Sequence, residues 1–242
     1  SEEVAWQDLI HGDAVRNPAG EGDLVLLKSN GYPTYNFACV VDDHEMGITH
    51  VIRGDDHVNN TPRQMQVYRA LGWEPPRFGH LPLIFDPKGE KISKRKTYEF
   101  PVTIEECRAM GYLPEAFINF IVLLGWSPGK DIEFMTMEEM IGHFTLDRVG
   151  SSPARFSHDK LCSFNAHYIR QAPLDRLVDL CRPLLGKEYD ISAVPPDKLR
   201  EAVRQQQGRA KTLPDITRQT RFFFAPEGVY DEKAVQKWLR NE

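Results

Sequence analysis

The densest group of reactive side chains in this sequence is a basic segment that follows an apolar stretch. Five cations lie within nine positions of the segment KGEKISKRK, namely Lys88, Lys91, Lys94, Arg95 and Lys96. Like charges this close together repel one another, so the segment is expected to form an exposed loop. A basic loop can close over a polyphosphate and stabilise the negative charge that develops in a transition state. From composition alone, a merely solvated loop is an equally good interpretation.

A second group of reactive side chains consists of Arg53 and two Asp-Asp-His triplets, at residues 42–44 and 55–57. Carboxylates and imidazoles bind transition metals, so the triplets allow the interpretation of a metal-dependent hydrolase. The first triplet falls at the end of an expected helix, where charged side chains are usually solvated, and this weighs against a metal cluster. For Arg53 taken alone, a salt bridge to Asp55 or Asp56 is the simplest interpretation.

The elements that position these residues alternate between strands and helices. Apolar runs predict strands at 23–28, 47–54 and 80–85, and helical spacing predicts helices at 35–46 and 61–71. Thr61 is the expected N-cap of the second helix, with Pro62 at its first position. This order of elements predicts an α/β layer with a partly parallel sheet.

The pattern becomes mostly helical beyond a break at residues 95–102. Thr103 with Glu106, and Thr136 with Glu139, have the spacing of capping boxes. The run 113–124 is apolar nearly all round, which predicts a buried helix. Amphipathic runs at 174–182, 197–207 and 231–240 extend the helical pattern.

Bulk properties place the chain among ordinary globular proteins. It has 242 residues, of which 41% are hydrophobic and 27% charged. Its longest apolar stretch, 117–126, is shorter than the roughly 20 residues that a bilayer requires, and we expect a cytoplasmic protein without membrane association. Its four cysteines are widely spaced without a C-x-x-C pair, which predicts reduced thiols and no zinc site.

Charge is unevenly distributed along the chain, whose formal net charge is −5. The segment 198–221 nevertheless carries seven basic residues against two acidic ones. A segment of this composition can face the phosphates of a nucleic acid.

The sequence of the basic loop resembles a known signature motif. Residues 91–95, KISKR, resemble the K-M-S-K-S signature of class I aminoacyl-tRNA synthetases in a form common among glutamyl enzymes. The segments GYPTYNFA (31–38), VDDH (41–44), THVIRGDDH (49–57) and NTPRQ (60–64) occur upstream in the order and spacing of the same family. The sequence therefore resembles a bacterial-type glutamyl-tRNA synthetase, and the similarity extends through SPARFSHDKL and HYIR to RFFF.

This resemblance implies an α/β fold: the C-terminal part of a class I nucleotide-binding, Rossmann-like core, followed by a mostly α-helical stem-contact region. Residues 1–100 are then the second half of the catalytic core, 101–225 the stem-contact region, and 226–242 the start of the anticodon-binding helical domain. The internal fragment so described lacks the N-terminal half of the catalytic domain and, after residue 242, the anticodon-binding domain.

Carried over residue by residue, the resemblance also implies two substrate sites. The glutamate site comprises Tyr35, Asn36, Phe37, Ala38, Cys39 and Arg53. The ATP site comprises Asp56, His57, Leu83, Ile84, Lys91, Ile92, Ser93, Lys94 and Arg95, with Lys91 and Lys94 as the catalytic lysines. Arg53 would bind a carboxylate through both arms of its guanidinium, whereas Cys39 replaces an asparagine found in some relatives, which weakens that contact.

The implied reaction is the ATP-dependent ligation of L-glutamate to tRNA(Glu) through glutamyl-adenylate. ATP enters with Mg²⁺, no protein-bound metal is expected, and the parent enzyme is expected to be monomeric. The His-x-Gly-His signature of class I synthetases is absent from the sequence. We therefore expect the chain by itself to be inactive.

Two other readings stay open. One is the paralogue that attaches glutamate to queuosine in tRNA-Asp; that family ends before the anticodon-binding domain, whereas this chain continues past RFFFAPEG. The other is a non-catalytic tRNA-binding or regulatory module that kept the fold without the chemistry. The intact lysine loop, Tyr35 and Arg53 weigh against this module, whereas the absent histidine signature favours it.

Overall fold

The structure, a computed structural model, describes residues 3–16, 23–93, 95–129 and 131–224. The chain divides into two compact units, each of which is described by itself. Unit 1 consists of residues 1–92 and 121–156, and unit 2 of residues 93–120 and 157–242. In the described part of the chain, no helix is both long and apolar enough to cross a membrane.

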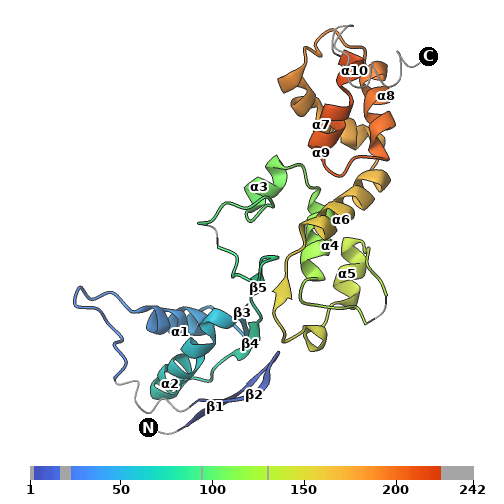
Figure 1. The fold of residues 1–242 in the computed structure, drawn as a ribbon. Helices are drawn as coiled ribbons and strands as arrows, with labels where there is room; N and C mark the ends of the chain where they lie inside the picture. Colours follow the sequence, from blue (N-terminus) through green and yellow to red (C-terminus); the bar gives the residue numbers. More distant parts are fainter. Residues whose placement is uncertain (1–2, 17–22, 94, 130, 225–242) are drawn as a thin grey trace. The chain divides into compact units, whose positions relative to one another are not determined.

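Unit 1 contains a four-stranded sheet, in the order β2-β1-β4-β3 (Figure 1). Its strands are β1 (Val4–Asp8), β2 (Gly12–Arg16), β3 (His50–Gly54) and β4 (Arg77–Leu81). β1 pairs with β2 in an antiparallel hairpin, and β4 pairs in parallel with both β1 and β3. The carboxyl ends of β1, β3 and β4 therefore share one edge, which is where ligands bind in open α/β sheets.

Two helices of unit 1 match the predicted ones. They are α1 (Tyr35–Glu45) and α2 (Thr61–Leu71), the latter preceded by the 3₁₀ helix η1 (Asp55–Asn60). The expected N-cap at Thr61 is wrong, because Asn60 occupies the cap and the Thr61 hydroxyl bonds to side chains of the sheet. The two helices contact each other through buried Val40, Val67 and Tyr68.

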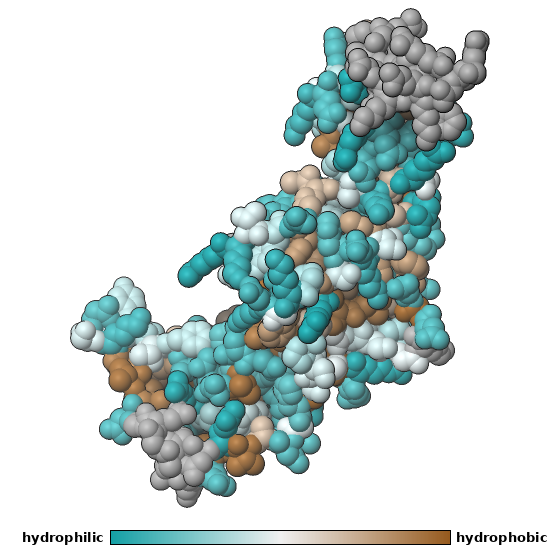
Figure 2. All heavy atoms as spheres, viewed as in Figure 1, coloured by the Kyte–Doolittle hydropathy of each residue, from teal (hydrophilic) through white to brown (hydrophobic). Residues whose placement is uncertain are grey.

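Two of the predicted strands are corrected by the structure. Residues 23–28 form no regular strand, because the chain turns back at once and makes only the single bridge of Leu27 with Pro33. Leu24 is half-buried against the cluster between α1 and α2, whereas Val25, Leu26 and Leu27 are exposed; Figure 2 shows brown atoms near the left edge of the molecule, and Val25 is 68% accessible. The predicted strand 80–85 is interrupted at Pro82, which lacks an N–H group for a sheet. It divides into the end of β4 and β5 (Ile84–Phe85), and β5 pairs with β6 (Ala154–Arg155).

The remainder of unit 1 is a small helical layer. It contains α5 (Met137–His143), whose expected capping box at Thr136 and Glu139 is present, and the 3₁₀ helix η2 (Leu146–Arg148). A buried cluster of Trp126, Met135 and Met140 forms its core.

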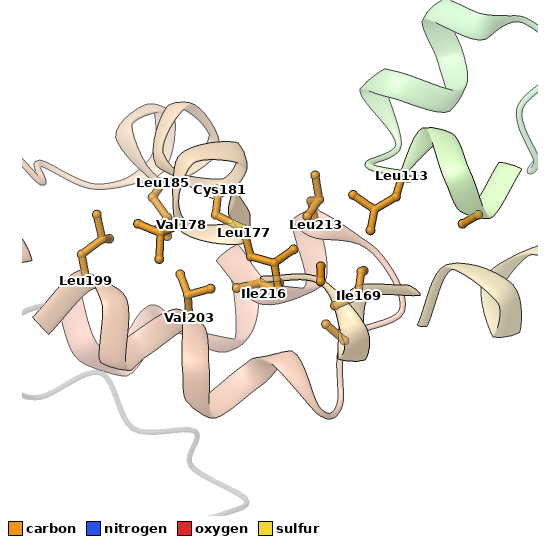
Figure 3. Packing of buried hydrophobic residues seen from close by; sticks show 13 residues of the cluster. Leu113, Ile169, Leu177, Val178, Cys181, Leu185, Leu199, Val203, Leu213 and Ile216 are labelled. Atoms are coloured by element: carbon orange, nitrogen blue, oxygen red, sulfur yellow. The ribbon is translucent and has the colours of Figure 1, made fainter. Parts of the chain in front are cut away.

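Unit 2 is helical. Its helices are α3 (Ile104–Ala109), α4 (Pro114–Val122), whose last two residues belong to unit 1, α6 (His158–Gln171), α7 (Leu174–Glu188), α8 (Pro196–Gln207), α9 (Leu213–Gln219) and α10 (Arg221–Phe224). Figure 3 shows their shared core, in which Leu177, Val203 and Ile216 point toward one another. The expectation that the helix at 113–124 is buried all round is wrong, since Ile118 and Ile121 are exposed. The predicted helix 231–240 lies outside the described residues.

Candidate active site

Arg53 is at the centre of the carboxyl edge of the sheet. Its guanidinium Nε donates to His80 Nε2 at 3.2 Å, and its Nη2 donates to Thr61 Oγ1 at 2.8 Å. The guanidinium also lies 5.5 Å from the centre of the Phe78 ring. Burial lowers the pKa of Arg53, but the group stays cationic in the neutral range. The structure therefore fixes a half-buried positive charge where strands β3 and β4 end.

A buried pair, Asp8 and His80, lies behind Arg53. Asp8 Oδ2 is 2.5 Å from His80 Nδ1, and the two side chains are 1% and 0% accessible. Burial alone would raise the pKa of Asp8, but the hydrogen bonds from His80 and from backbone N–H groups outweigh it and lower that pKa. Asp8 is consequently a carboxylate that is anchored to the sheet.

One face of α1 is turned toward Arg53. Tyr35, Cys39 and Asp43 follow one another at a spacing of four residues and interact electrostatically with the guanidinium. Burial and a hydrogen bond with Cys39 raise the pKa of Tyr35, and burial raises the pKa of Asp43 against the opposing effect of Arg53. The arrangement suits a small ligand that carries a carboxylate and other polar groups.

The other expected glutamate-site residues have different surroundings. Asn36 accepts a hydrogen bond from Gln64 Nε2 at 3.2 Å, and Phe37 packs against the apolar cluster between α1 and α2. Ala38 is half-buried within α1. The structure thus brings Tyr35 and Cys39 together with Arg53, whereas Phe37 contributes to packing.

On the expected nucleotide side, Asp56 and Lys91 form an ion pair of 3.2 Å. Lys91 lowers the pKa of Asp56. The position of Asp56 requires glycine at residue 54, because a Cβ there would lie 2.6 Å from Asp56 Oδ1. His57 lies beside this pair in sequence; its Nδ1 is 3.2 Å from Asn60 Nδ2, and its ring centre is 6.0 Å from that of Tyr35.

The turn before Lys91 is held by the buried carboxylate of Asp86. Asp86 Oδ1 accepts from the N–H groups of Lys88 and Glu90, at 2.9 and 2.8 Å. The chain then returns past β5, where the Ile84 carbonyl accepts from the N–H of Ile92 at 3.4 Å. This carbonyl is therefore engaged within the protein, and Leu83, which is half-buried, precedes it.

The lysine loop spans the division between the two units, which falls between Ile92 and Ser93. Within unit 2, the N–H of Ser93 donates to the Tyr98 hydroxyl at 3.1 Å, and the Ser93 hydroxyl accepts from the N–H of Arg95 at 3.3 Å. The expected phosphate contact Lys94 lies outside the described residues.

The two Asp-Asp-His triplets have separate partners. His44 stacks on Trp73 with ring centres 3.8 Å apart, and Asp55 contacts His11 at 2.8 Å. Among the described residues there is no group of three His, Cys, Asp or Glu side chains that could hold a metal ion. The geometry gives no support to the metal-hydrolase interpretation.

A mostly parallel sheet whose carboxyl edge carries a fixed arginine, followed by a basic loop, is an arrangement typical of α/β proteins that bind nucleotides. Comparison with protein families specifies the class further. The model described as "tRNA synthetases class I (E and Q), catalytic domain" matches residues 1–163, and one described as "Anticodon binding domain" matches residues 176–242. The chain belongs to the class I tRNA synthetases of the E and Q family, which confirms the predicted family and fold class.

Individual relatives agree with this assignment. The chain is 46% identical to glutamate–tRNA ligase 1 of Syntrophus aciditrophicus and 43% identical to the glutamate–tRNA ligase of Desulforamulus reducens, in each case over 97% of this chain. It is also similar to the crystal structure of an Elizabethkingia meningosepticum glutamate tRNA ligase in complex with its amino acid, with a TM-score of 0.87, 37% identity and 98% of this chain covered. The chain spans about half the length of these relatives, 49% and 50% for the two ligases and 50% for the solved structure.

Sequence reasoning missed several residues of this site. Asp8, His80 and Asp86 are buried polar residues that no motif singled out. Asp8 had a usable signal, because Val4, Trp6 and Asp8 alternate along a strand whose inward positions are otherwise apolar. The partnership of Asp8 with His80 joins residues 72 positions apart, so the local sequence gave no indication of it.

Proposed function

We propose that this chain contributes the glutamate-binding and part of the ATP-binding machinery of an enzyme that ligates L-glutamate to tRNA(Glu). In this reaction the glutamate α-carboxylate attacks the α-phosphate of ATP to form glutamyl-adenylate and pyrophosphate. The terminal ribose of the tRNA then accepts the glutamyl group. The names of relatives such as those of Syntrophus aciditrophicus and Desulforamulus reducens, which are glutamate–tRNA ligases, support the proposal.

The observation that carries the proposal is the position of Arg53. A fixed guanidinium at the carboxyl edge of the sheet, faced by Tyr35 and Cys39 of α1, can bind a carboxylate through two parallel hydrogen bonds. Asn36, Phe37 and Ala38 belong to the proposed site through the family resemblance. We assign the side-chain carboxylate of glutamate to Arg53, because a neutral amide would leave this buried charge without a counter-ion.

The ATP site is proposed around Asp56, His57 and the first part of the lysine loop. Lys91 is held by Asp56 in the structure, and incoming phosphates can compete for it because exposed ion pairs contribute little. Leu83 and Ile84 are proposed to line the adenine, while Ile92, Ser93, Lys94 and Arg95 follow as the loop over the phosphates. Mg²⁺ would enter with ATP as part of the substrate.

The tRNA is proposed to meet unit 2 through its phosphate backbone. Of the seven basic residues in segment 198–221, three pair with carboxylates: Arg200 with Asp175, Arg204 with Glu201 and Arg218 with Asp215. These pairs lie in solvent and are weak, so phosphates can replace the carboxylates. The extent of the stem-contact region, 101–225, and of the following anticodon-binding segment stays a prediction; the anticodon-binding match begins at residue 176.

Glutamate-dependent ATP–pyrophosphate exchange in the presence of tRNA tests the proposal. We expect no exchange from residues 1–242 alone, and exchange once the upstream half of the Syntrophus aciditrophicus ligase is fused before them. Arg53→Ala in this fusion should abolish exchange at ordinary glutamate concentrations. Tight tRNA binding by the fusion without any exchange would instead identify a non-catalytic module and overturn the proposal.

A further inference from the structure

The guanidinium of Arg53 is held along only one of its two hydrogen-bonding edges. Nε donates to His80 and Nη2 donates to Thr61, and these two N–H groups lie on the same side of the planar group. The opposite edge consists of Nη1 and the second N–H of Nη2. In the described part of the chain we find no hydrogen bond to Nη1, so that edge can receive a carboxylate.

The same contacts determine which nitrogen of His80 carries a proton. Arg53 Nε can only donate, so His80 Nε2 must accept. The proton of the neutral ring then resides on Nδ1, which donates to Asp8 Oδ2. Both side chains are inaccessible to solvent, so no water can take the place of either partner.

Asp8 is in turn fixed by the backbone. Its other oxygen, Oδ1, accepts from the N–H groups of Ile10, His11 and His80 at 3.0 to 3.1 Å. A carboxylate with both oxygens engaged has one orientation available. A continuous series of hydrogen bonds therefore runs from the main chain through Asp8 and His80 to Arg53.

We propose that Asp8 and His80 are positioning residues for the amino-acid substrate: Asp8 fixes the tautomer of His80, and His80 holds Arg53 with its free edge toward the substrate carboxylate. This inference rests on the proposed glutamate site. It assigns a function to two side chains that are fully buried and act on the substrate through Arg53.

Asp8→Asn is the most selective test, because it replaces one carboxylate oxygen of Asp8 by an NH₂ group. The three backbone N–H groups hold the amide oxygen at the Oδ1 position, so the NH₂ group faces His80 Nδ1. His80 must then accept there and move its proton to Nε2, where it opposes the N–H of Arg53. In the active fusion we expect the KM for glutamate to rise by about tenfold to a hundredfold, since hydrogen bonds to charged groups contribute about 1.5–3 kcal/mol. The KM for ATP should stay within about threefold of the parent value.

Two substitutions of His80 form a matched pair. In His80→Gln the amide oxygen can occupy the Nε2 position and still accept from Arg53, whereas in His80→Asn the amide can reach only Asp8. His80→Gln loses the buried hydrogen bond to Asp8, and His80→Asn loses the contacts of Nε2 with Arg53 and Thr61, so both variants should be less stable than the parent. If His80 acts by positioning Arg53, His80→Gln retains most of the glutamate affinity and His80→Asn does not. Equal losses of affinity in the two variants would mean that His80 is merely structural.

Arg53→Lys separates this inference from the proposed function. It keeps the charge but removes the Nε contact, so Asp8→Asn should add no further increase in the KM for glutamate in this background. An unchanged glutamate KM in Arg53→Lys alone would overturn the proposed site and the positioning role together. A raised KM in Arg53→Lys with an unchanged KM in Asp8→Asn would overturn the positioning role and leave the site in place.

Discussion

At the scale of single residues, the candidate site depends on one position where a side chain cannot be accommodated. Gly54 follows Arg53, and an added methyl group would lie 2.6 Å from Asp56 Oδ1, closer than such contacts occur. The Asp56 carboxylate is the part that must move. Asp56 pairs with Lys91, so the arrangement of the nucleotide side requires a residue without a Cβ at position 54.

Asp56 belongs to the proposed ATP site, so Gly54→Ala, which displaces it, is expected to raise the KM for ATP by up to about fivefold, with a smaller effect on the KM for glutamate. Pyrophosphate exchange at varied ATP concentration measures it in the active fusion. Gly125→Ala is the control, since a Cβ there would meet nothing within 4 Å. An ATP KM that is unaltered by Gly54→Ala would show that the position of Asp56 has no role in nucleotide binding.

The buried carboxylate of Asp8 predicts a specific dependence of stability on acid. Its pKa lies below the ordinary value of 3.8, so in the native state it loses its proton more readily than in the unfolded state. The stability it contributes is fully present above that ordinary value and is lost as the pH falls through the lower native pKa. Urea unfolding of the parent chain and of Asp8→Ala, from about pH 5 down to about pH 2, should show the difference in unfolding free energy shrinking in acid. A difference that grows in acid would contradict the lowered pKa.

At the scale of helices and strands, short-range signals in the sequence were reliable where they involve only neighbours. The capping boxes of α3 and α5 are present as predicted, with the Thr136 hydroxyl accepting from the N–H of Glu139 at 3.2 Å. The bounds of α1 and α2 also agree closely with the prediction. These features depend on contacts three or four residues apart, which the order of residues specifies directly.

Thr136→Ala should consequently lower the unfolding free energy of α5 by about 1 kcal/mol. Hydrogen exchange of the amides in α5 measures this loss locally. Thr145→Ala is a matched control, because Thr145 precedes η2 at the equivalent position without a side-chain cap. Equal loss of protection in both variants would mean that the capping bond of Thr136 contributes nothing.

Features that depend on distant partners were not predictable in this way. The apolar run 23–28 has the composition of a strand, yet no neighbouring strand pairs with it beyond one bridge. The run 80–85 is interrupted at Pro82, where β4 has already ended. Strand β1 was not predicted, although its buried residues alternate with exposed ones. Thr61 shows the same limit at the site: its sequence context favours capping, but the buried contacts with Arg53 and His80 prevail.

At the scale of the whole molecule, each unit has its own hydrophobic core. Leu177, which is fully buried, belongs to the core of unit 2, whereas the cluster around Trp126 belongs to unit 1. Three tryptophans, Trp6, Trp73 and Trp126, lie in unit 1, and Trp238 lies outside the described residues. The two cores can therefore be observed separately.

In a Trp238→Phe background, tryptophan fluorescence reports unit 1, whereas far-ultraviolet circular dichroism reports mainly the helices of unit 2. Leu177→Ala should destabilise unit 2 by about 2–5 kcal/mol. The dichroism transition in urea should then move to lower denaturant, with a smaller shift in fluorescence. Equal shifts of both signals would show that the units unfold as one cooperative block.

The division of the chain into interleaved units also has a consequence for its synthesis. Leu113 and Ala116 leave the ribosome about a hundred residues before their core partner Ile216. At translation rates of about 5–20 residues per second, this apolar segment waits for roughly 5–20 seconds. The second segment of unit 1 meanwhile ends at residue 156. Nascent unit 2 therefore exposes an unpaired apolar helix during elongation, and this is the interval in which a chaperone that binds apolar segments would act on it.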